Sequence, residues 1–433
     1  MLKRFLIVLL IIIITVGCNS NINIMPMQNQ TMFNTFSNNN VNKLLVDKDE
    51  IFPEIYNMID SAQKSIQISI FLYGGTIAKT ISDKLISKQK QGVKIQFVSD
   101  KSLGTVKKAK EDMIAALKYL IQNGVEVRLF PMEKMPKGPS WLSNLGIICH
   151  SKIVVVDGKT AIIGGMNFND MESINHDYMV RINGTVASEL GNLVNEDWQI
   201  STPYNNSGKK QNINLHFDTV NTTGIVAETG IKIQNTRQLF VAGFKNARTS
   251  IYIEQLFMDD KDSISALIEA KQRGVDVRVI LNCLEYGKHL FEFLDKLPIK
   301  GAPNYSAINK LLSANIPVKW FIPSSKDQML HAKTQLIDGE YFIIGSANMT
   351  YRAFDKNREV VVGIHDKSIG DRFTNIFLND WNNRAQEIKS LTKWEKFLAW
   401  CFDKVTQGLY GRNEPTEADF EKLIGNKTPE DFE

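Results

Sequence analysis

An internal repeat limits the fold of this chain more than any other feature of its sequence. The stretch 65–157 recurs as 250–338, with its pieces in the same order. Each copy begins with a β-rich run and continues with a helical pattern that ends near a glycine, Gly92 in the first copy and Gly274 in the second. A second β-rich run follows in both. Because strand, helix and strand succeed one another, each copy predicts βαβ units and a largely parallel sheet.

The repeat also predicts the domain organisation. A chain of 433 residues is long enough for two domains with separate cores. We expect lobe 1 over 43–200, a polar linker over 201–228 and lobe 2 over 229–390. The remaining 391–433 should hold a C-terminal helix and a polar tail. Its apolar residues have the spacing of a helix packed on a core, which we favour over a membrane-binding helix: Trp394, Phe397, Leu398, Trp400 and Phe402.

The N-terminus has the pattern of an export signal. Residues 1–17 combine two basic residues with an apolar run, Phe5 to Val16, that is too short to span a bilayer. A cysteine follows directly, and the whole resembles a bacterial lipoprotein signal, although Thr15 stands where such signals prefer leucine. The resemblance implies cleavage before Cys18, lipidation of that residue and an extracytoplasmic, membrane-anchored protein; an uncleaved anchor is the alternative. The polar stretch 18–42 predicts a flexible tether.

Each copy of the repeat ends in a motif of chemically reactive side chains. Lysine falls two residues after a histidine, aspartate seven, glycine fourteen and asparagine seventeen residues after it, in both copies. Alternate side chains of a strand share one face, so each histidine and its lysine should converge on one spot. Two copies with the same spacings have no comparable structural explanation. The residues are His150, Lys152, Asp157 and Asn167 in the first copy and His331, Lys333, Asp338 and Asn348 in the second.

The pattern H-x-K-x4-D, present twice, resembles the phospholipase D superfamily over about residues 45 to 390. The resemblance implies an α/β fold of two pseudo-twofold-related lobes, each a largely parallel or mixed sheet flanked by helices. It also implies that both motifs meet in one site, where two histidines, two lysines and two asparagines hold a phosphate. One histidine would attack phosphorus and form a phosphohistidine, while the other protonates the departing alkoxide. The resemblance assigns His150 as nucleophile and His331 as acid, though the near symmetry leaves these roles reversible. Such a site needs neither a metal nor another cofactor.

The acidic residues near the motifs divide into two groups. Asp157 and Asp338 each precede a glycine between β-rich runs, which is typical of hairpin turns, so we expect a structural role for both. Asp177 follows the first motif histidine by 27 residues, and Glu359 follows the second by 28. The resemblance places a carboxylate there, hydrogen-bonded to the other ring nitrogen of the catalytic histidine and fixing its tautomer.

Two further features lack a clear chemical signal. His176 adjoins Asp177 and could line the site, but a structural role is favoured because no other histidine shares its spacing. Both lobes close with similar residues, Asn-Glu-Asp before Trp198 and Leu-Asn-Asp before Trp381. We expect these to be helix residues that pack on the sheets.

The motifs define a reaction type and leave the substrate open. The superfamily includes phospholipases, cardiolipin and phosphatidylserine synthases, and nucleases. Formal charge is +4, and it falls to +2 when the basic residues at positions 3 and 4 leave with the signal. Membrane attachment and weak charge favour a phospholipase D-type phosphodiesterase acting on phospholipid as a monomer, by hydrolysis or, alternatively, by cardiolipin-synthase-like transfer. A nuclease is the other alternative, but nucleic acid would call for a basic groove with aromatics. A catalytically silent scaffold is disfavoured because both motifs are intact.

Overall fold

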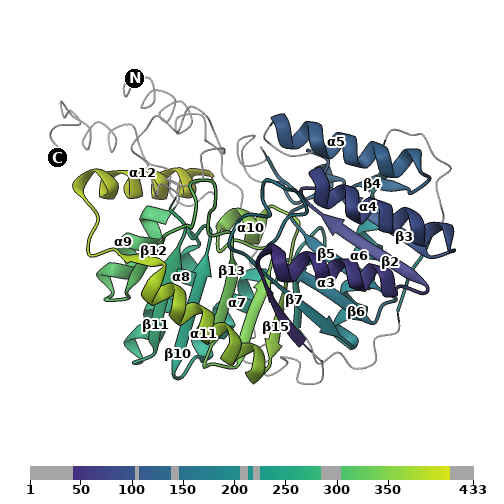
Figure 1. Ribbon diagram of the computed structural model, residues 1–433. Helices are drawn as coiled ribbons and strands as arrows, with labels where there is room; N and C mark the ends of the chain where they lie inside the picture. Colours follow the sequence, from purple (N-terminus) through teal and green to yellow (C-terminus); the bar gives the residue numbers. More distant parts are fainter. Residues whose placement is uncertain are drawn as a thin grey trace.

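The computed structural model describes residues 42–102, 107–137, 146–204, 213–217, 225–283 and 304–409 (Figure 1). The predicted signal peptide, the lipidation site Cys18, nearly all of the tether and the polar tail lie outside these residues. Within them, no helix combines the length and the apolar character needed to cross a membrane.

Lobe 1 is built on an eight-stranded sheet with the order β1-β7-β6-β5-β2-β3-β4-β8. Only β2, β3 and β4 are paired in parallel, whereas β5 pairs antiparallel both with β2 and with its hairpin partner β6. The strands are β1 Asn42–Val46, β2 Ser65–Ile70, β3 Lys94–Ser99, β4 Val127–Leu129, β5 Lys152–Val156, β6 Thr160–Gly164, β7 Tyr178–Asn183 and β8 Thr202–Pro203. The helices are α3 Asp47–Ser61, α4 Gly75–Lys90, α5 Lys107–Gln122, the short η1 Met132–Lys134 and α6 Thr185–Ile200.

Lobe 2 repeats this sheet strand for strand, in the order β9-β15-β14-β13-β10-β11-β12-β16. The strands are β9 Ile225–Thr229, β10 Ser250–Gln255, β11 Asp276–Leu281, β12 Val318–Phe321, β13 Lys333–Ile337, β14 Tyr341–Gly345, β15 Glu359–His365 and β16 Ala385–Glu387. The helices are α7 Thr236–Asn246, α8 Lys261–Gln272, α9 Tyr305–Ser313, α10 Tyr351–Asp355, α11 Lys367–Asn383 and α12 Lys393–Leu409. The expected α/β fold of two related lobes with mixed sheets is therefore confirmed, and the parallel part of each sheet is limited to three strands.

The sheets reach further along the chain than the sequence predicted. Both ends of the expected linker 201–228 belong to sheets, since β8 pairs with β4 and β9 pairs with β15. The connection between the lobes is correspondingly shorter. The predicted C-terminal helix is α12, which packs Leu398 and Ala399 into the apolar core of lobe 2 (Figure 1).

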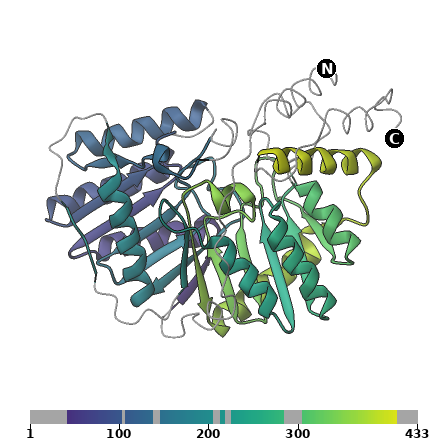
Figure 2. The same cartoon turned by 180° about the vertical axis from the view of Figure 1, so that it is seen from behind.

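The two lobes share a central apolar core, and each also has a core of its own. Strand β5 shows how its residues are divided: Val154 and Val156 face the outer core under α3, α4 and α5, while Ile153 and Val155 face a central core. Because both faces of the strand are covered, it reads as a continuous apolar run in the sequence. The central core draws residues from the sheets of both lobes and from α6 and α11. Seen from behind, α6 covers the face of the lobe 1 sheet away from α3 to α5 (Figure 2).

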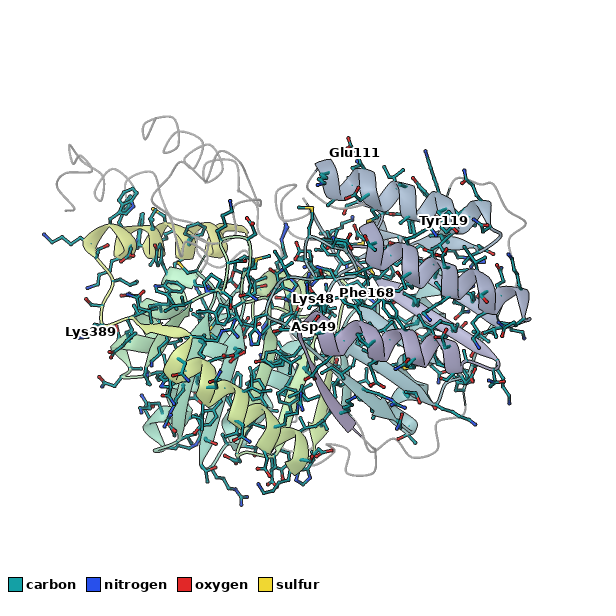
Figure 3. All side chains as sticks on the ribbon, viewed as in Figure 1. Lys48, Asp49, Glu111, Tyr119, Phe168 and Lys389 are labelled. Carbon is teal, nitrogen blue, oxygen red and sulfur yellow. The ribbon has the colours of Figure 1, made fainter. Side chains whose placement is uncertain are left out.

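Polar contacts join the lobes around this core. The start of α3, where Figure 3 labels Lys48 and Asp49, lies at the lobe boundary. There the guanidinium of Arg372 on α11 binds the Glu50 carboxylate at 2.7 Å. This exposed ion pair adds a polar contact between the lobes at the edge of the central core.

The motif aspartates lie in the hairpin turns expected from their sequence context. Asp157 and Gly158 have φ angles of 55° and 65°, as a type I′ hairpin turn requires, and the turn closes from the N–H of Lys159 to the carbonyl of Val156 at 3.0 Å. The Asp157 carboxylate accepts hydrogen bonds from the backbone N–H groups of Gln63, Lys64 and Ser65. In lobe 2 the Asp338 carboxylate accepts the corresponding N–H groups of Arg248, Thr249 and Ser250. Each aspartate therefore ties a hairpin to the start of the neighbouring strand.

Candidate active site

The two motif histidines lie at the lobe boundary, each two residues before the strand that begins with its lysine. Both segments pair with the backbone of the opposite lobe. The N–H of His150 donates to the carbonyl of Arg358 at 2.8 Å, and the N–H of Arg358 donates to the carbonyl of Ile148 at 2.9 Å. In the other half the N–H of His331 donates to the carbonyl of His176 at 2.9 Å. Two short bridges, related by the pseudo-twofold axis, therefore cross between the lobes.

Each histidine is hydrogen-bonded to a carboxylate of the opposite lobe. Nδ1 of His150 lies 3.1 Å from Oε2 of Glu359, and Nδ1 of His331 lies 2.6 Å from Oδ2 of Asp177. Both carboxylates are those that the sequence located. Counting along the chain did not indicate which histidine each one binds, and the structure shows that the pairs are exchanged between lobes. With Nδ1 engaged, Nε2 of each ring remains available for chemistry.

The lysines and asparagines of the motifs complete the site. Lys152 and Lys333 are 0% and 1% exposed. Nζ of Lys152 donates to the carbonyl of His150 at 2.6 Å, and Lys333 makes the corresponding contact with the carbonyl of His331. Within the described residues, the amide oxygens of Asn167 and Asn348 have no hydrogen-bond partner. An amide oxygen only accepts hydrogen bonds, so it is the NH2 group of each asparagine that could donate to an anionic ligand.

Electrostatics identify the site as one that favours an anion. Burial lowers the pKa of Lys152 to about 7, and the nearby Lys333 charge adds to the effect. Burial likewise lowers the pKa of Lys333 to about 8. The pKa of His331 falls well below its usual value, first through burial and then through the charge of Lys333. Positive charge is therefore crowded in a desolvated space, and a bound phosphodiester would relieve this repulsion.

The two histidine–carboxylate pairs differ in their surroundings. Glu359 accepts the hydroxyl of Ser346 at 2.5 Å and the amide of Asn357 at 3.2 Å, so its carboxylate is well satisfied. Gly165 occupies the position that corresponds to Ser346, and a Cβ there would come within 2.2 Å of the Asp177 carboxylate. Burial raises the pKa of Asp177 to about 7. Ser346 and Asn357 were not predicted from the sequence, although the two repeats differ at the position of Gly165 and Ser346.

His176 has a structural role, as favoured from the sequence. Its Nδ1 lies 2.9 Å from Oδ1 of Asp47, and its Nε2 lies 2.9 Å from the hydroxyl of Tyr178 and 3.0 Å from Oδ2 of Asp380. Burial by itself would lower the pKa of His176, but hydrogen bonds to Asp380 and Asp47 raise it to about 10. His176 is therefore a buried cation at the lobe boundary.

Asp380 is one of the residues before the closing tryptophans, and its counterpart Asp197 binds Arg358 with both Nε–carboxylate distances at 3.1 Å. Both aspartates were expected only to pack on the sheets. Their contacts across the lobes were not predicted, because the motifs around them carry no catalytic pattern.

One set of side chains among the described residues could reach a common metal ion: His176, Glu254 and Asp380. The Tyr178 hydroxyl lies between two of them, donating to Glu254 at 2.8 Å while lying 2.9 Å from Nε2 of His176. Glu254 and Asp380 are thus arranged around a protonated imidazole and a hydroxyl. This geometry is that of a hydrogen-bonded network.

Comparison with known proteins supports the superfamily that the motifs resemble. A family model described as "Cardiolipin synthase, PLD-like domain" matches residues 55–198 and 240–381, one match in each lobe. A cardiolipin synthase of Bacillus cereus is 26% identical over 374 residues, covering 82% of this chain and 68% of that protein. A probable cardiolipin synthase of Bacillus subtilis is 27% identical over 358 residues, covering 78% of this chain and 67% of that protein. The chain thus spans about two thirds of the length of both relatives.

Solved structures show the same fold. The crystal structure of a phosphatidylserine synthase from Haemophilus influenzae superposes with a TM-score of 0.61 at 15% identity, covering 80% of this chain and 87% of that chain. A polyphosphate kinase from Porphyromonas gingivalis gives a TM-score of 0.51 at 13% identity, covering 89% of this chain and 53% of that one. With a family model matched in both lobes and the paired motifs meeting at their boundary, this chain belongs to the phospholipase D-like domain family of the phospholipase D superfamily.

Proposed function

We propose that this protein is a phosphatidyl transferase that moves the phosphatidyl group of a phospholipid to an alcohol through a phosphohistidine intermediate. The observation that carries the proposal is the pair of crossed histidine–carboxylate contacts beside two buried lysines. Hydrolysis was the first expectation from the sequence. The similarity to proteins named cardiolipin synthases supports transfer, the alternative, better than hydrolysis.

In the first step, Nε2 of His150 forms a bond to phosphorus while the bond from phosphorus to the departing oxygen breaks. Glu359 holds Nδ1 of the attacking ring, which fixes the tautomer that has its lone pair on Nε2. Burial lowers the pKa of His331 in the free site, but the bound phosphodiester anion favours its imidazolium form, which gives the proton from its Nε2 to the departing alkoxide. Lys152 and Lys333 neutralise the charge that gathers on the non-bridging oxygens, and the two motif asparagines donate hydrogen bonds to them.

In the second step, the incoming alcohol gives its proton to Nε2 of His331 and its oxygen bonds to phosphorus as the bond to His150 breaks. Asp177 holds the other nitrogen of His331 at 2.6 Å and stabilises the imidazolium that forms. The protonated His331 is then ready for the next leaving group. Water in place of the alcohol would give hydrolysis by the same residues.

The test is the fate of a labelled donor. Purified protein would receive radiolabelled phosphatidylglycerol in mixed micelles, with EDTA and with or without added glycerol, and a parallel sample would receive single- and double-stranded DNA. We expect cardiolipin as the labelled product, its yield falling as glycerol competes for the intermediate, with DNA left intact. The His331→Ala protein is the matched blank.

Other products would contradict the proposal in different ways. Phosphatidic acid as the sole product at every acceptor concentration would identify a hydrolase. Turnover that is lost in EDTA and restored by a divalent metal would overturn the metal-independent mechanism. Cleavage of DNA without turnover of lipid would favour the nuclease alternative.

A further inference from the structure

The residue directly before each site carboxylate connects the two lobes. Arg358 precedes Glu359, and His176 precedes Asp177. Both residues are 2% exposed, and the backbone of each forms the bridge to the histidine segment of the opposite lobe. The next side chain along the chain is then the carboxylate that holds that same histidine.

The sheets show that these two residues are structural equivalents. In lobe 1, Gly164 pairs with Met179 across β6 and β7, and in lobe 2, Gly345 pairs with Val361 across β14 and β15. Counting back three residues from Met179 and from Val361 gives positions 176 and 358. A histidine and an arginine therefore occupy the same place in the fold.

Their side chains bind equivalent aspartates across the lobe boundary. Arg358 of lobe 2 binds Asp197 on α6 of lobe 1, with Nε 3.1 Å from both carboxylate oxygens. His176 of lobe 1 binds Asp380 on α11 of lobe 2, with Nε2 3.0 Å from Oδ2. All four side chains are buried. Each aspartate stands directly before the tryptophan that closes its lobe, Trp198 or Trp381 in the sequence.

We propose that His176 and Arg358 are positioning residues: each is a cation held by an aspartate of the opposite lobe, and each fixes the backbone bridge that sets one site histidine against its carboxylate. The proposal rests on the proposed function, since it assigns how the two halves of that same site are kept in register. It gives the paired aspartates of α6 and α11 a part in the reaction that their sequence context did not suggest.

The geometry explains why the anchor should matter for rate. Arg358 and His176 are each held by the main chain to the histidine segment of the opposite lobe and by the side chain to a helix of that lobe. The next residue along the chain is the site carboxylate. Loss of the side-chain anchor removes the contact that holds this segment to the opposite helix, so the segment can shift locally even though the shared core still joins the lobes. A displacement of about 1 Å at reacting groups can cost about 100-fold in rate.

The surroundings of His176 require a cation there. Asp47 comes from the start of α3, Tyr178 from β7, Glu254 from β10 and Asp380 from α11, while Arg384 lies 3.4 Å from Asp380. The imidazole also stacks on Phe321 with ring centres 5.4 Å apart and planes 2° from parallel. Three carboxylates face the ring, so a neutral residue at this position would weaken the compensation of the two buried ones, Glu254 and Asp380.

The experiment removes each anchor without changing its volume. Asp380→Asn and Asp197→Asn would be compared with the wild type in steady-state turnover of the phospholipid and of bis(4-nitrophenyl) phosphate. We expect kcat to fall about 10- to 100-fold in each variant while KM changes less than about threefold, as for residues that orient a catalytic group. The matched control is His365→Gln, which removes an exposed histidine–carboxylate pair, His365 with Glu340 at 3.2 Å, and should keep the wild-type kcat.

A second pair of variants separates the cation from packing. His176→Arg places at this position the residue found in the other half, and a planar guanidinium can stack on Phe321 as the imidazole does. His176→Gln keeps hydrogen bonding without charge. We expect His176→Arg to retain most of kcat and His176→Gln to lose it. Equal activity in the two variants would overturn the role of the cation.

Hydrogen–deuterium exchange provides a readout that does not depend on any substrate. In Asp380→Asn, the peptide covering 329–332 should exchange faster, because the His331 N–H bonds to the His176 carbonyl, while the peptide covering 148–151 stays protected. Asp197→Asn should give the reverse. Unchanged exchange and unchanged kcat in both variants would contradict the proposal. Equal loss of protection in both peptides would also contradict it, because that result indicates general destabilisation. If the wild type turns over no phosphodiester, the proposed function fails, whereas the exchange pattern still decides whether these anchors hold the bridges.

Discussion

Lys152 and Lys333 should lose their charge in a pH range where most lysines keep theirs. Burial lowers their pKa values to about 7 and about 8, from an ordinary value of 10.5. Raising the pH through this range removes positive charge from the free site, so we expect kcat/KM to fall above about pH 7 to 8. A bound phosphodiester anion favours the charged lysines, and the alkaline limb of kcat should therefore lie at higher pH than that of kcat/KM. Profiles of both constants from pH 6 to 10 measure this, and coincident limbs would contradict it.

The two histidines should behave as one unit. Because one phosphoryl group must meet both, His150→Ala and His331→Ala should each remove nearly all activity, and the double variant should be hardly worse. Two independent lobes would instead leave about half of the activity in each single variant.

Their separate roles can be distinguished by trapping the intermediate. A substrate with a nitrophenolate leaving group needs little protonation, so His331→Ala should still form a radiolabelled adduct on His150. Acid quenching and peptide mapping would locate the label. An adduct on His331 in the His150→Ala protein would reverse the assignment and keep the mechanism.

The residues of the site could be predicted from spacing, but their partners could not. Matching distances from each histidine located the lysines and asparagines, and the family resemblance located the two carboxylates, 27 and 28 residues after the histidines. Which carboxylate meets which histidine depends on how the lobes face each other, and no periodicity within a lobe contains that information. The contacts of His176 and Arg358 are hidden for the same reason: their partners, Asp380 and Asp197, lie in the opposite lobe.

At the scale of elements, substitutions in the hairpin turns should lower the free energy of unfolding and leave kcat nearly unchanged. Asp157→Ala removes the acceptor of three backbone N–H groups and places alanine at a φ of 55°, where a residue with a Cβ is strained. We expect a loss of about 1–3 kcal/mol in the free energy of unfolding, measured in urea. The kcat of the folded protein should stay within about twofold, since this turn lies at the far end of β5 from His150.

Asp157→Asn is the matched control for that turn. Asparagine adopts the left-handed region more readily than alanine and keeps one oxygen acceptor, so its loss of stability should be smaller. A large fall in kcat with unchanged unfolding would show instead that the motif aspartates act in the site.

Helices and strands were predicted best where both copies of the repeat contain them. Gly92 and Gly274, expected at helix C-termini, follow α4 and α8 with φ angles of 88° and 93°. The edge strands β8 and β16 were not predicted, because two or three residues show no alternation. The sequence predicted more parallel strand pairs than the sheets contain. In each lobe an Asp-Gly turn joins the motif strand to the next strand as an antiparallel hairpin.

For the whole molecule, attachment to a membrane remains a prediction from the N-terminal sequence. The apolar run that ends before Cys18 predicts cleavage and lipidation there, so the mature protein should fractionate with membranes. Mass spectrometry of the mature N-terminus should find a diacylglyceryl group on Cys18, and Cys18→Ser should release the protein. Equal release of both forms, or an unmodified cysteine, would exclude lipidation.

The crossed pairs also set how activity depends on concentration once the chain is divided. A cut between residues 204 and 213 would give two fragments, each with one histidine and the carboxylate that serves the other fragment's histidine. Neither fragment alone can assemble a complete pair from one copy of itself, and the central apolar core gives the two a shared surface on which to associate. At concentrations well below their dissociation constant, diluting both fragments tenfold should lower the rate about 100-fold, because the complex forms by mass action. The intact chain, diluted in the same way, should lose only about tenfold, so the order of reaction reports directly on whether one site needs residues of both lobes.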